Sequence, residues 1–171
     1  IQQRIHSTVK NDFTWLRSSR RGWHMDAVMP GMKNEEAMEV DVYLDMSGSI
    51  GEEQARDFIS EVKGMMEQFK DYRIRIACFD TQVYNFQEYT GDSGDDIAEY
   101  ELKGGGGTDF DCMFQFMKDQ DIQPNLMICF TDGYPCGSWG DANYCDTLWV
   151  IHGQKNPQPP FGTWALYEKN K

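Results

Sequence analysis

The sequence feature that most constrains the fold is a turn that reads Asp-Met-Ser-Gly-Ser at residues 45–49. It follows a stretch at residues 38–44 in which apolar side chains alternate, as in a β-strand, and it precedes a helical pattern that starts near Gly51. Open α/β sheets bind their ligands at the carboxyl ends of such strands. Asp45, Ser47 and Ser49 are hard oxygen donors, which suit Mg²⁺ or Mn²⁺ better than zinc or copper. The turn therefore indicates the first half of a divalent-metal site.

The rest of the chain alternates between strand and helix patterns. Apolar residues recur at helical spacing from Ala55 to Phe69 and from Phe110 to Met117. Strand patterns cover residues 73–79, 125–130, 147–152 and 163–166, residues 83–86 are expected to pair antiparallel with 73–79 at a sheet edge, and a short helical turn is expected at 95–100. We therefore predict an α/β fold, a Rossmann-like three-layer sandwich whose mostly parallel central sheet has one antiparallel edge strand.

A second group of oxygen donors follows later in the chain. The nearly continuous apolar run at 125–130 is typical of a central parallel strand, and it ends in Thr131-Asp132-Gly133. Right-handed crossovers would make this strand parallel to 38–44, and as neighbours about 5 Å apart the two strands would bring Asp45 and Asp132 to one ion.

A glycine run at residues 104–107 leads into Thr108 at the start of the second helical pattern. No lysine follows as a P-loop requires, so we do not interpret the run as a phosphate cradle. Thr108 is either a metal ligand or an ordinary helix N-cap. The candidate metal ligands are thus Asp45, Ser47, Ser49, Thr108 and Asp132.

Composition limits the partners that such a chain can have. The 171 residues fit one domain, and 28 acidic against 16 basic side chains give a net charge of −12. This charge repels phosphate backbones, which argues against nucleic-acid binding. No apolar run approaches the roughly 20 residues of a membrane span, and no signal peptide is evident. The five cysteines are odd in number and mostly lie in apolar patterns, so we expect reduced thiols in a cytoplasmic protein.

The first part of the chain, residues 1–37, has no sustained periodicity. It contains a basic cluster, Arg17, Arg20 and Arg21, between two tryptophans. We expect an arm that packs on a domain formed by residues 38–171. Because the first residue is Ile1, we also expect the chain to be a piece of a longer protein.

The three motifs together, Asp45-x-Ser47-x-Ser49, Gly-Gly-Thr108 and Thr-Asp132-Gly, resemble the metal-ion-dependent adhesion site of von Willebrand factor A (VWA) domains. The resemblance covers about residues 38–170. It implies that Ser47 and Ser49 bind Mg²⁺ (or Mn²⁺ or Ca²⁺) directly and Thr108 directly or through water. Asp45 and Asp132 would neutralise the ion mostly through water or the hydroxyls. An open coordination position would then take an Asp or Glu side chain of a protein partner.

The segments 18–21 and 29–31 further resemble a bacterial and phage subfamily in which such a domain follows a metallopeptidase-like region. No His-Glu-x-x-His occurs in this chain, so any peptidase activity would reside upstream and the domain itself is not expected to be an enzyme. One alternative is an adaptor subunit for an AAA+ ATPase, as related domains in chelatase complexes imply. Another is a metal-dependent phosphohydrolase with Asp45 as nucleophile, although Ser47 stands where that pattern has a second aspartate.

Two other clusters are weaker candidates. Cys136 and Cys145 are too far apart for the usual structural zinc spacing, and we interpret them as loop cysteines. Asp92, Asp95 and Asp96 lack the spacing of a calcium loop, which favours a solvated loop.

Overall fold

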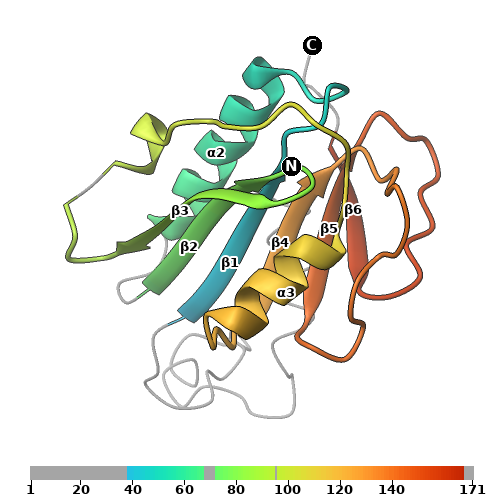
Figure 1. The fold of residues 1–171 in the computed structure, drawn as a ribbon. Coiled ribbons are helices and arrows are strands. Elements are labelled where there is room, and N and C mark those ends of the chain that lie inside the picture. The colour runs from blue at the N-terminus through green and yellow to red at the C-terminus, as the bar shows by residue number, and fades with distance from the viewer. Residues whose placement is uncertain (1–37, 68–71, 95, 168–171) are drawn as a thin grey trace, which may run out of the picture.

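The computed structural model describes residues 38–67, 72–94 and 96–167, and these residues form one sheet with helices on both faces (Figure 1). The predicted arm at residues 1–37 lies outside the described residues. The strands are β1 (Met38–Asp45), β2 (Tyr72–Phe79), β3 (Val83–Thr90), β4 (Leu126–Thr131), β5 (Thr147–His152) and β6 (Thr163–Tyr167). The helices are α2 (Glu52–Met66), α3 (Asp111–Asp119) and the short 3-10 helix η2 (Ile97–Glu99).

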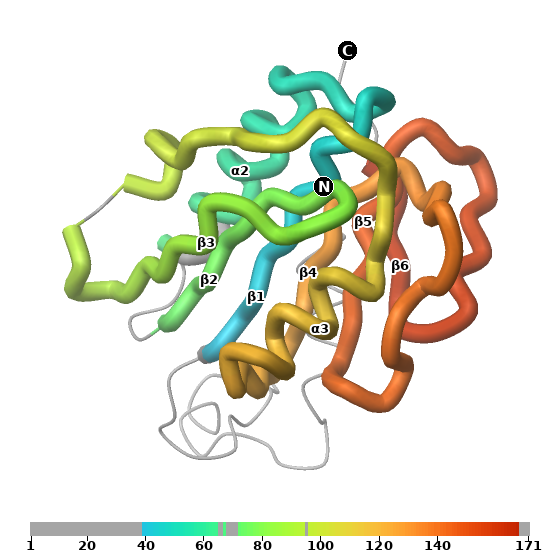
Figure 2. Tube along the Cα trace, viewed as in Figure 1, coloured from blue at the N-terminus to red at the C-terminus, as the bar shows by residue number. Residues whose placement is uncertain are grey.

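The sheet confirms the predicted fold class. Its six strands have the order β3-β2-β1-β4-β5-β6, and only β3, at one edge, runs antiparallel to its neighbour. β1 therefore lies between β2 and β4 and is parallel to both. Two connections between parallel strands, β1 to β2 through α2 and β2 to β4 through α3, place a helix on each face (Figures 1 and 2).

The alternation along β1 sends side chains into two separate cores. Val42 and Leu44 belong to the core beneath α2, in which Phe58 stacks on Phe130 with ring centroids 4.6 Å apart. Tyr43 belongs to the core beneath α3. Both faces of β1 are thus buried, which explains the high apolar content of this strand and fixes its register.

Aromatic loops, and no helices, connect β4 to β5 and β5 to β6. Trp149 of β5 is fully buried on the α3 face, where Trp139 and Phe161 of these two loops contact it at centroid distances of 4.9 and 5.6 Å. The Trp149 indole N–H donates to the Phe161 carbonyl oxygen over 2.9 Å. Large aromatic side chains bury enough area to cover a sheet without a helix.

All five cysteines are free thiols, and Cys78 and Cys129 are buried in the sheet. In the part of the chain that the structure describes, no helix has the length and apolar character needed to cross a membrane.

Asp41 of β1 is a fully buried carboxylate that pairs with Arg75 of β2, whose Nε donates to Oδ1 over 2.6 Å. The other carboxylate oxygen, Oδ2, has no hydrogen-bond partner. Burial raises the pKa of Asp41 to about 6, although the charge of Arg75 lowers it. The folded chain therefore holds this proton more tightly than the unfolded chain does.

We predict that the stabilising contribution of Asp41 is fully present below about pH 4 and is lost as pH rises through about 6. The free energy of unfolding of the wild type relative to Asp41→Asn should therefore fall between pH 4 and pH 7, by on the order of 3 kcal/mol. Urea unfolding at a series of pH values measures this difference. Asp92→Asn, in an exposed loop, is the control and should show little change. A difference for Asp41→Asn that rises with pH would contradict the prediction.

Candidate metal centre

The candidate centre lies at the edge of the sheet where β1 and β4 end. The two strands pair in parallel, with Leu44 opposite Phe130, so Asp45 and Thr131 end the strands at the same level. The segment between η2 and α3, which carries the glycine run and Thr108, passes over this edge (yellow in Figures 1 and 2). Three turns that are far apart in sequence therefore meet at one place.

Asp45 is the buried part of the centre, with no exposed surface. The Ser47 backbone N–H donates to its Oδ1 over 2.9 Å, and the Thr131 hydroxyl donates to its Oδ2 over 2.6 Å. The Thr108 hydroxyl lies 3.4 Å from Oδ1 and 3.5 Å from Oδ2. These contacts hold the carboxylate in one orientation and bring Thr108 to it.

Ser47, Ser49 and Asp132 form the rest of the centre, in which Asp132 is half-buried. The hydroxyl oxygens of Ser47 and Ser49 are 3.1 Å apart, and Ser49 donates a short hydrogen bond to Asp132 Oδ2. Ser49 is exposed, whereas Ser47 is nearly buried. The structure thus brings all five sequence-predicted site residues together in one connected set of polar contacts.

The hydroxyl of Thr108 does not cap α3. The N-cap of α3 is Phe110, which makes no side-chain capping hydrogen bond, and the side chain that accepts the N–H of Asp111, the first residue of α3, is that of Asp109, over 3.0 Å. Thr108 is 3 % exposed and its hydroxyl lies against Asp45. The N-cap alternative for Thr108 is therefore wrong, and its hydroxyl belongs to the candidate centre.

Among the residues that the structure describes, no basic side chain pairs with the two carboxylates of the centre. Burial raises the pKa of Asp45, the hydrogen bonds from Thr131 and Ser47 lower it, and the nearby Asp132 raises it, with a net upward shift. A bound cation would offset the cost of holding both carboxylates ionised.

The chemistry of the donors fits a hard divalent ion. Carboxylate and hydroxyl oxygens are ligands of Mg²⁺, Mn²⁺ and Ca²⁺. The described residues contain no cluster of three or more His, Cys, Asp or Glu side chains suited to a metal. Besides its two carboxylates, the side-chain oxygens of the centre are hydroxyls, namely those of Ser47, Ser49, Thr108 and Thr131.

Two residues that support the centre were not predicted from the sequence, Thr131 and Gln154. Thr131 bonds Asp45 directly and accepts the Gly133 backbone N–H over 3.0 Å. Its position before Asp132 at the end of a strand is a signal that could have identified it. The Gln154 side-chain amide donates to the Asp132 carbonyl oxygen over 2.7 Å and so holds the turn after β4. Gln154 lies in the β5–β6 loop, where no sequence pattern indicates this contact.

The loop from Cys136 to Cys145 packs beside the centre. The Cys136 backbone N–H donates to the Thr108 carbonyl oxygen over 2.8 Å, which ties this loop to the glycine run. Trp139 then turns inward and contacts Phe110 at a centroid distance of 5.2 Å. The side chain of Cys136 is exposed and that of Cys145 is partly buried. The aromatic part of the loop therefore covers the core beneath α3.

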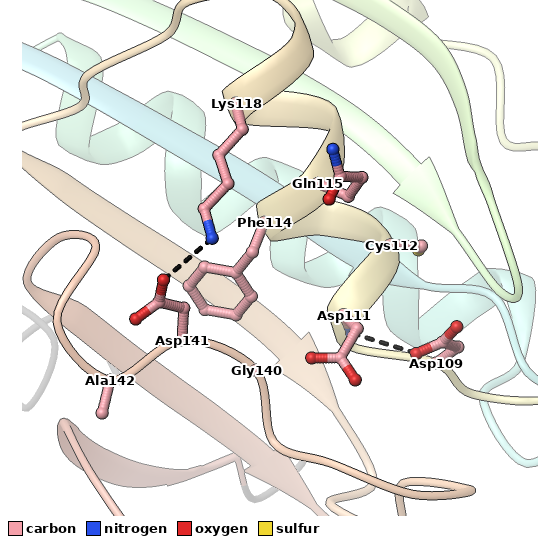
Figure 3. Close-up of a pocket in the computed structure, with 9 residues that line it drawn as sticks. All are labelled: Asp109, Asp111, Cys112, Phe114, Gln115, Lys118, Gly140, Asp141 and Ala142. Atoms are coloured by element: carbon pink, nitrogen blue, oxygen red, sulfur yellow. Dashed lines mark hydrogen bonds and ion pairs between the residues drawn. The ribbon is translucent and has the colours of Figure 1, made fainter.

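A hollow of about 690 Å³ lies along α3 and is closed on the other side by the loop that carries Asp141 (Figure 3). An ion pair of 2.9 Å between Lys118 and Asp141 joins α3 to the facing loop across it. The residues that line the hollow are Asp109, Asp111, Cys112, Phe114, Gln115, Lys118, Gly140, Asp141 and Ala142. None of the five candidate ligands lines this hollow, so it is separate from the candidate centre.

Comparisons with known proteins agree with the observed fold. Residues 40–167 match the family described as VWA-like domain (DUF2201). A protein of Thermotoga maritima is 28% identical over 121 residues, which cover 71% of this chain and 28% of that protein. The chain thus spans little more than a quarter of the length of this relative.

Two solved structures of VWA-like fold superpose on most of the chain. The ArnB paralog VWA2 from Sulfolobus acidocaldarius has a TM-score of 0.53 and 17% identity, covering 69% of this chain and 35% of that one. The conserved hypothetical protein BatB from Bacteroides thetaiotaomicron has a TM-score of 0.53 and 15% identity, covering 68% of this chain and 67% of that one. At such identities the likeness concerns the fold alone. Since the family match extends over most of the chain, we conclude that this protein belongs to the family of VWA-like domains (DUF2201).

Proposed function

We propose that this chain is a divalent-metal-dependent protein-binding module in which Mg²⁺ bridges to an Asp or Glu side chain of a protein partner. The observation that carries the proposal is the meeting of five oxygen-bearing side chains, from three separate turns, in one set of contacts around Asp45 and Asp132. Protein interaction is the general role of VWA-like domains, to which the chain belongs. The metal and the partner carboxylate are the specific parts of the proposal.

Each residue has a distinct part in this function. Ser47, Ser49 and Thr108 would hold the ion through neutral hydroxyls, while Asp45 and Asp132 would neutralise its charge. A bound Mg²⁺ would supply a concentrated positive charge to a chain whose net charge is −12. An acidic partner side chain would then be attracted to a surface that otherwise repels it.

The environment of Asp45 supports binding over hydrolysis. A nucleophilic carboxylate needs an oxygen that reaches the substrate. Asp45 is fully buried, its Oδ1 accepts the Ser47 N–H and its Oδ2 accepts the Thr131 hydroxyl. We therefore assign no catalytic role to Asp45. The Thermotoga maritima relative is much longer than this chain, which supports a role for such a module as the recognition domain of a larger protein. We expect that larger protein to be related to metallopeptidases.

We predict that Mn²⁺, as a spectroscopic substitute for Mg²⁺, binds the wild-type chain at this centre. Ser49→Ala removes an exposed hydroxyl and should weaken Mn²⁺ binding by about tenfold or more, equivalent to roughly 1.4 kcal/mol. Asp45→Ala should abolish binding, because it removes both charge and the anchor of Ser47. Electron paramagnetic resonance (EPR) of free and bound Mn²⁺ measures the affinity.

Asp92→Ala is the matched control for this experiment. It removes the same charge from an exposed loop and should leave Mn²⁺ affinity unchanged. Equal affinity in the wild type, Ser49→Ala and Asp45→Ala would show that Mn²⁺ binds elsewhere on the acidic surface, and the proposal would be wrong.

We also predict that the bound ion keeps a position for an incoming carboxylate. Propionate, which imitates a glutamate side chain, should displace water from protein-bound Mn²⁺ and lower the proton relaxivity of the solvent in a saturable way. Propionamide has nearly the same shape without the charge and should have no such effect. If propionate leaves the relaxivity unchanged while Mn²⁺ stays bound, the metal does not bridge to carboxylates.

A further inference from the structure

Asp80 is a third aspartate at the same edge of the sheet, immediately after β2. β2 is the neighbour of β1 on the side away from β4, and Phe79 is paired with Asp45. The residue is only 4 % exposed. The sequence predicts no more than a turn at this position, yet a buried carboxylate needs partners to offset the loss of water.

The carboxylate of Asp80 accepts hydrogen bonds from two parts of the chain. Its Oδ1 accepts a short bond from the Thr81 backbone N–H and a bond of 3.3 Å from that of Gln82, both within its own turn. Its Oδ2 accepts the Gly106 backbone N–H over 3.0 Å, which is the contact that reaches the glycine run. Burial alone would raise the pKa of Asp80, but these N–H donors outweigh it and lower the pKa.

The backbone of Asp80 makes a second contact with the same segment. Its carbonyl oxygen accepts the Asp109 N–H over 2.8 Å. Thr108 thus lies between two residues, Gly106 and Asp109, that are both bonded to Asp80. On the far side, the Thr108 carbonyl oxygen accepts the Cys136 N–H over 2.8 Å.

The glycine run needs such an anchor because it has no regular structure of its own. Residues 100–109 form neither helix nor strand, and residues 103–107 are exposed. Close approach at Gly106 also depends on the absence of a side chain. A Cβ there would lie 3.0 Å from Asp80 Oδ2 and 3.2 Å from its Cγ.

We propose that Asp80 is a positioning residue of the metal centre: through Gly106 it holds the glycine run so that the Thr108 hydroxyl faces Asp45. The inference rests on the proposed function and deepens it, since it names a residue that controls a ligand without being one. Both Asp80 oxygens already accept N–H donors, which suits an anchor for the backbone.

The test is a double-mutant cycle on Mn²⁺ affinity with Asp80→Asn and Thr108→Val. The asparagine keeps the shape of the side chain but presents an amide N–H₂ to one of the backbone N–H donors, so one anchor is lost. Asp80→Asn should weaken Mn²⁺ binding on the order of tenfold, as is usual for groups that orient metal ligands. In the Thr108→Val background the same change should have almost no further effect, because the hydroxyl that Asp80 positions is gone.

Controls separate positioning from general loss of stability. Asp96→Asn is the control, because Asp96 also accepts a backbone N–H two residues on, from Ala98 over 2.9 Å, in an exposed turn outside the centre where it also pairs with Lys63. It should leave Mn²⁺ affinity unchanged. Gly106→Ala disturbs the same contact by adding a Cβ close to the Asp80 carboxylate. It should also weaken Mn²⁺ binding only where Thr108 is present. If Asp80→Asn fails to fold, the double-mutant cycle is measured with Gly106→Ala and Thr108→Val instead.

The outcomes distinguish this inference from the proposed function. If Mn²⁺ binds the wild type and is lost in Ser49→Ala, but the effects of Asp80→Asn and Thr108→Val add fully, the positioning role is wrong and the metal centre stands. The same holds if Asp80→Asn binds Mn²⁺ as tightly as the wild type. If Ser49→Ala has no effect on Mn²⁺ binding, the proposed function fails and the role of Asp80 fails with it.

Discussion

The parallel pairing of β1 with β4 is the constraint on which the rest of the molecule depends. With Leu44 opposite Phe130, the two strands end together, and Asp45 and Asp132 share one edge of the sheet. A shift of one residue in either strand would turn its buried side chains to the opposite face. Because both faces of β1 and β4 pack in cores, such a shift is costly. The apolar cores therefore fix the position of the polar centre.

This arrangement brings negative charges together at a cost in stability. Asp45 is buried next to Asp132, and the raised pKa of Asp45 records that cost. A structure selected for stability alone would gain from an apolar residue here. The hydroxyl and N–H donors that surround Asp45 offset part of the cost and orient its oxygens. A carboxylate that is buried beside a second acid and oriented by fixed donors is an arrangement that a cation would stabilise.

Strong periodic patterns made the sheet and the helices predictable, and the three motifs with their family resemblance made the meeting of the five residues predictable. β3 was predicted too short, at residues 83–86. The polar residues Gln87 and Glu88 interrupt the apolar pattern before the buried Tyr89, and the pairing register shifts between Ile76 and Cys78 of β2. The direction of the Thr108 hydroxyl was left open, since a threonine before a helix has the same sequence signature as a cap. The anchor at Asp80 could not be predicted, because it depends on where Gly106, 26 residues further along, passes in space.

The three turns of the centre are tied to one another through their backbones as well as their side chains. Met46 N–H donates to the Phe79 carbonyl oxygen over 2.9 Å, and Asp109 N–H donates to that of Asp80 over 2.8 Å. The Cys136 N–H donates to the Thr108 carbonyl oxygen over 2.8 Å. Each turn is thereby held by its neighbour through main-chain hydrogen bonds. Such bonds restrict the conformations that each turn can adopt, so little conformational entropy is left to lose when a ligand contacts these turns.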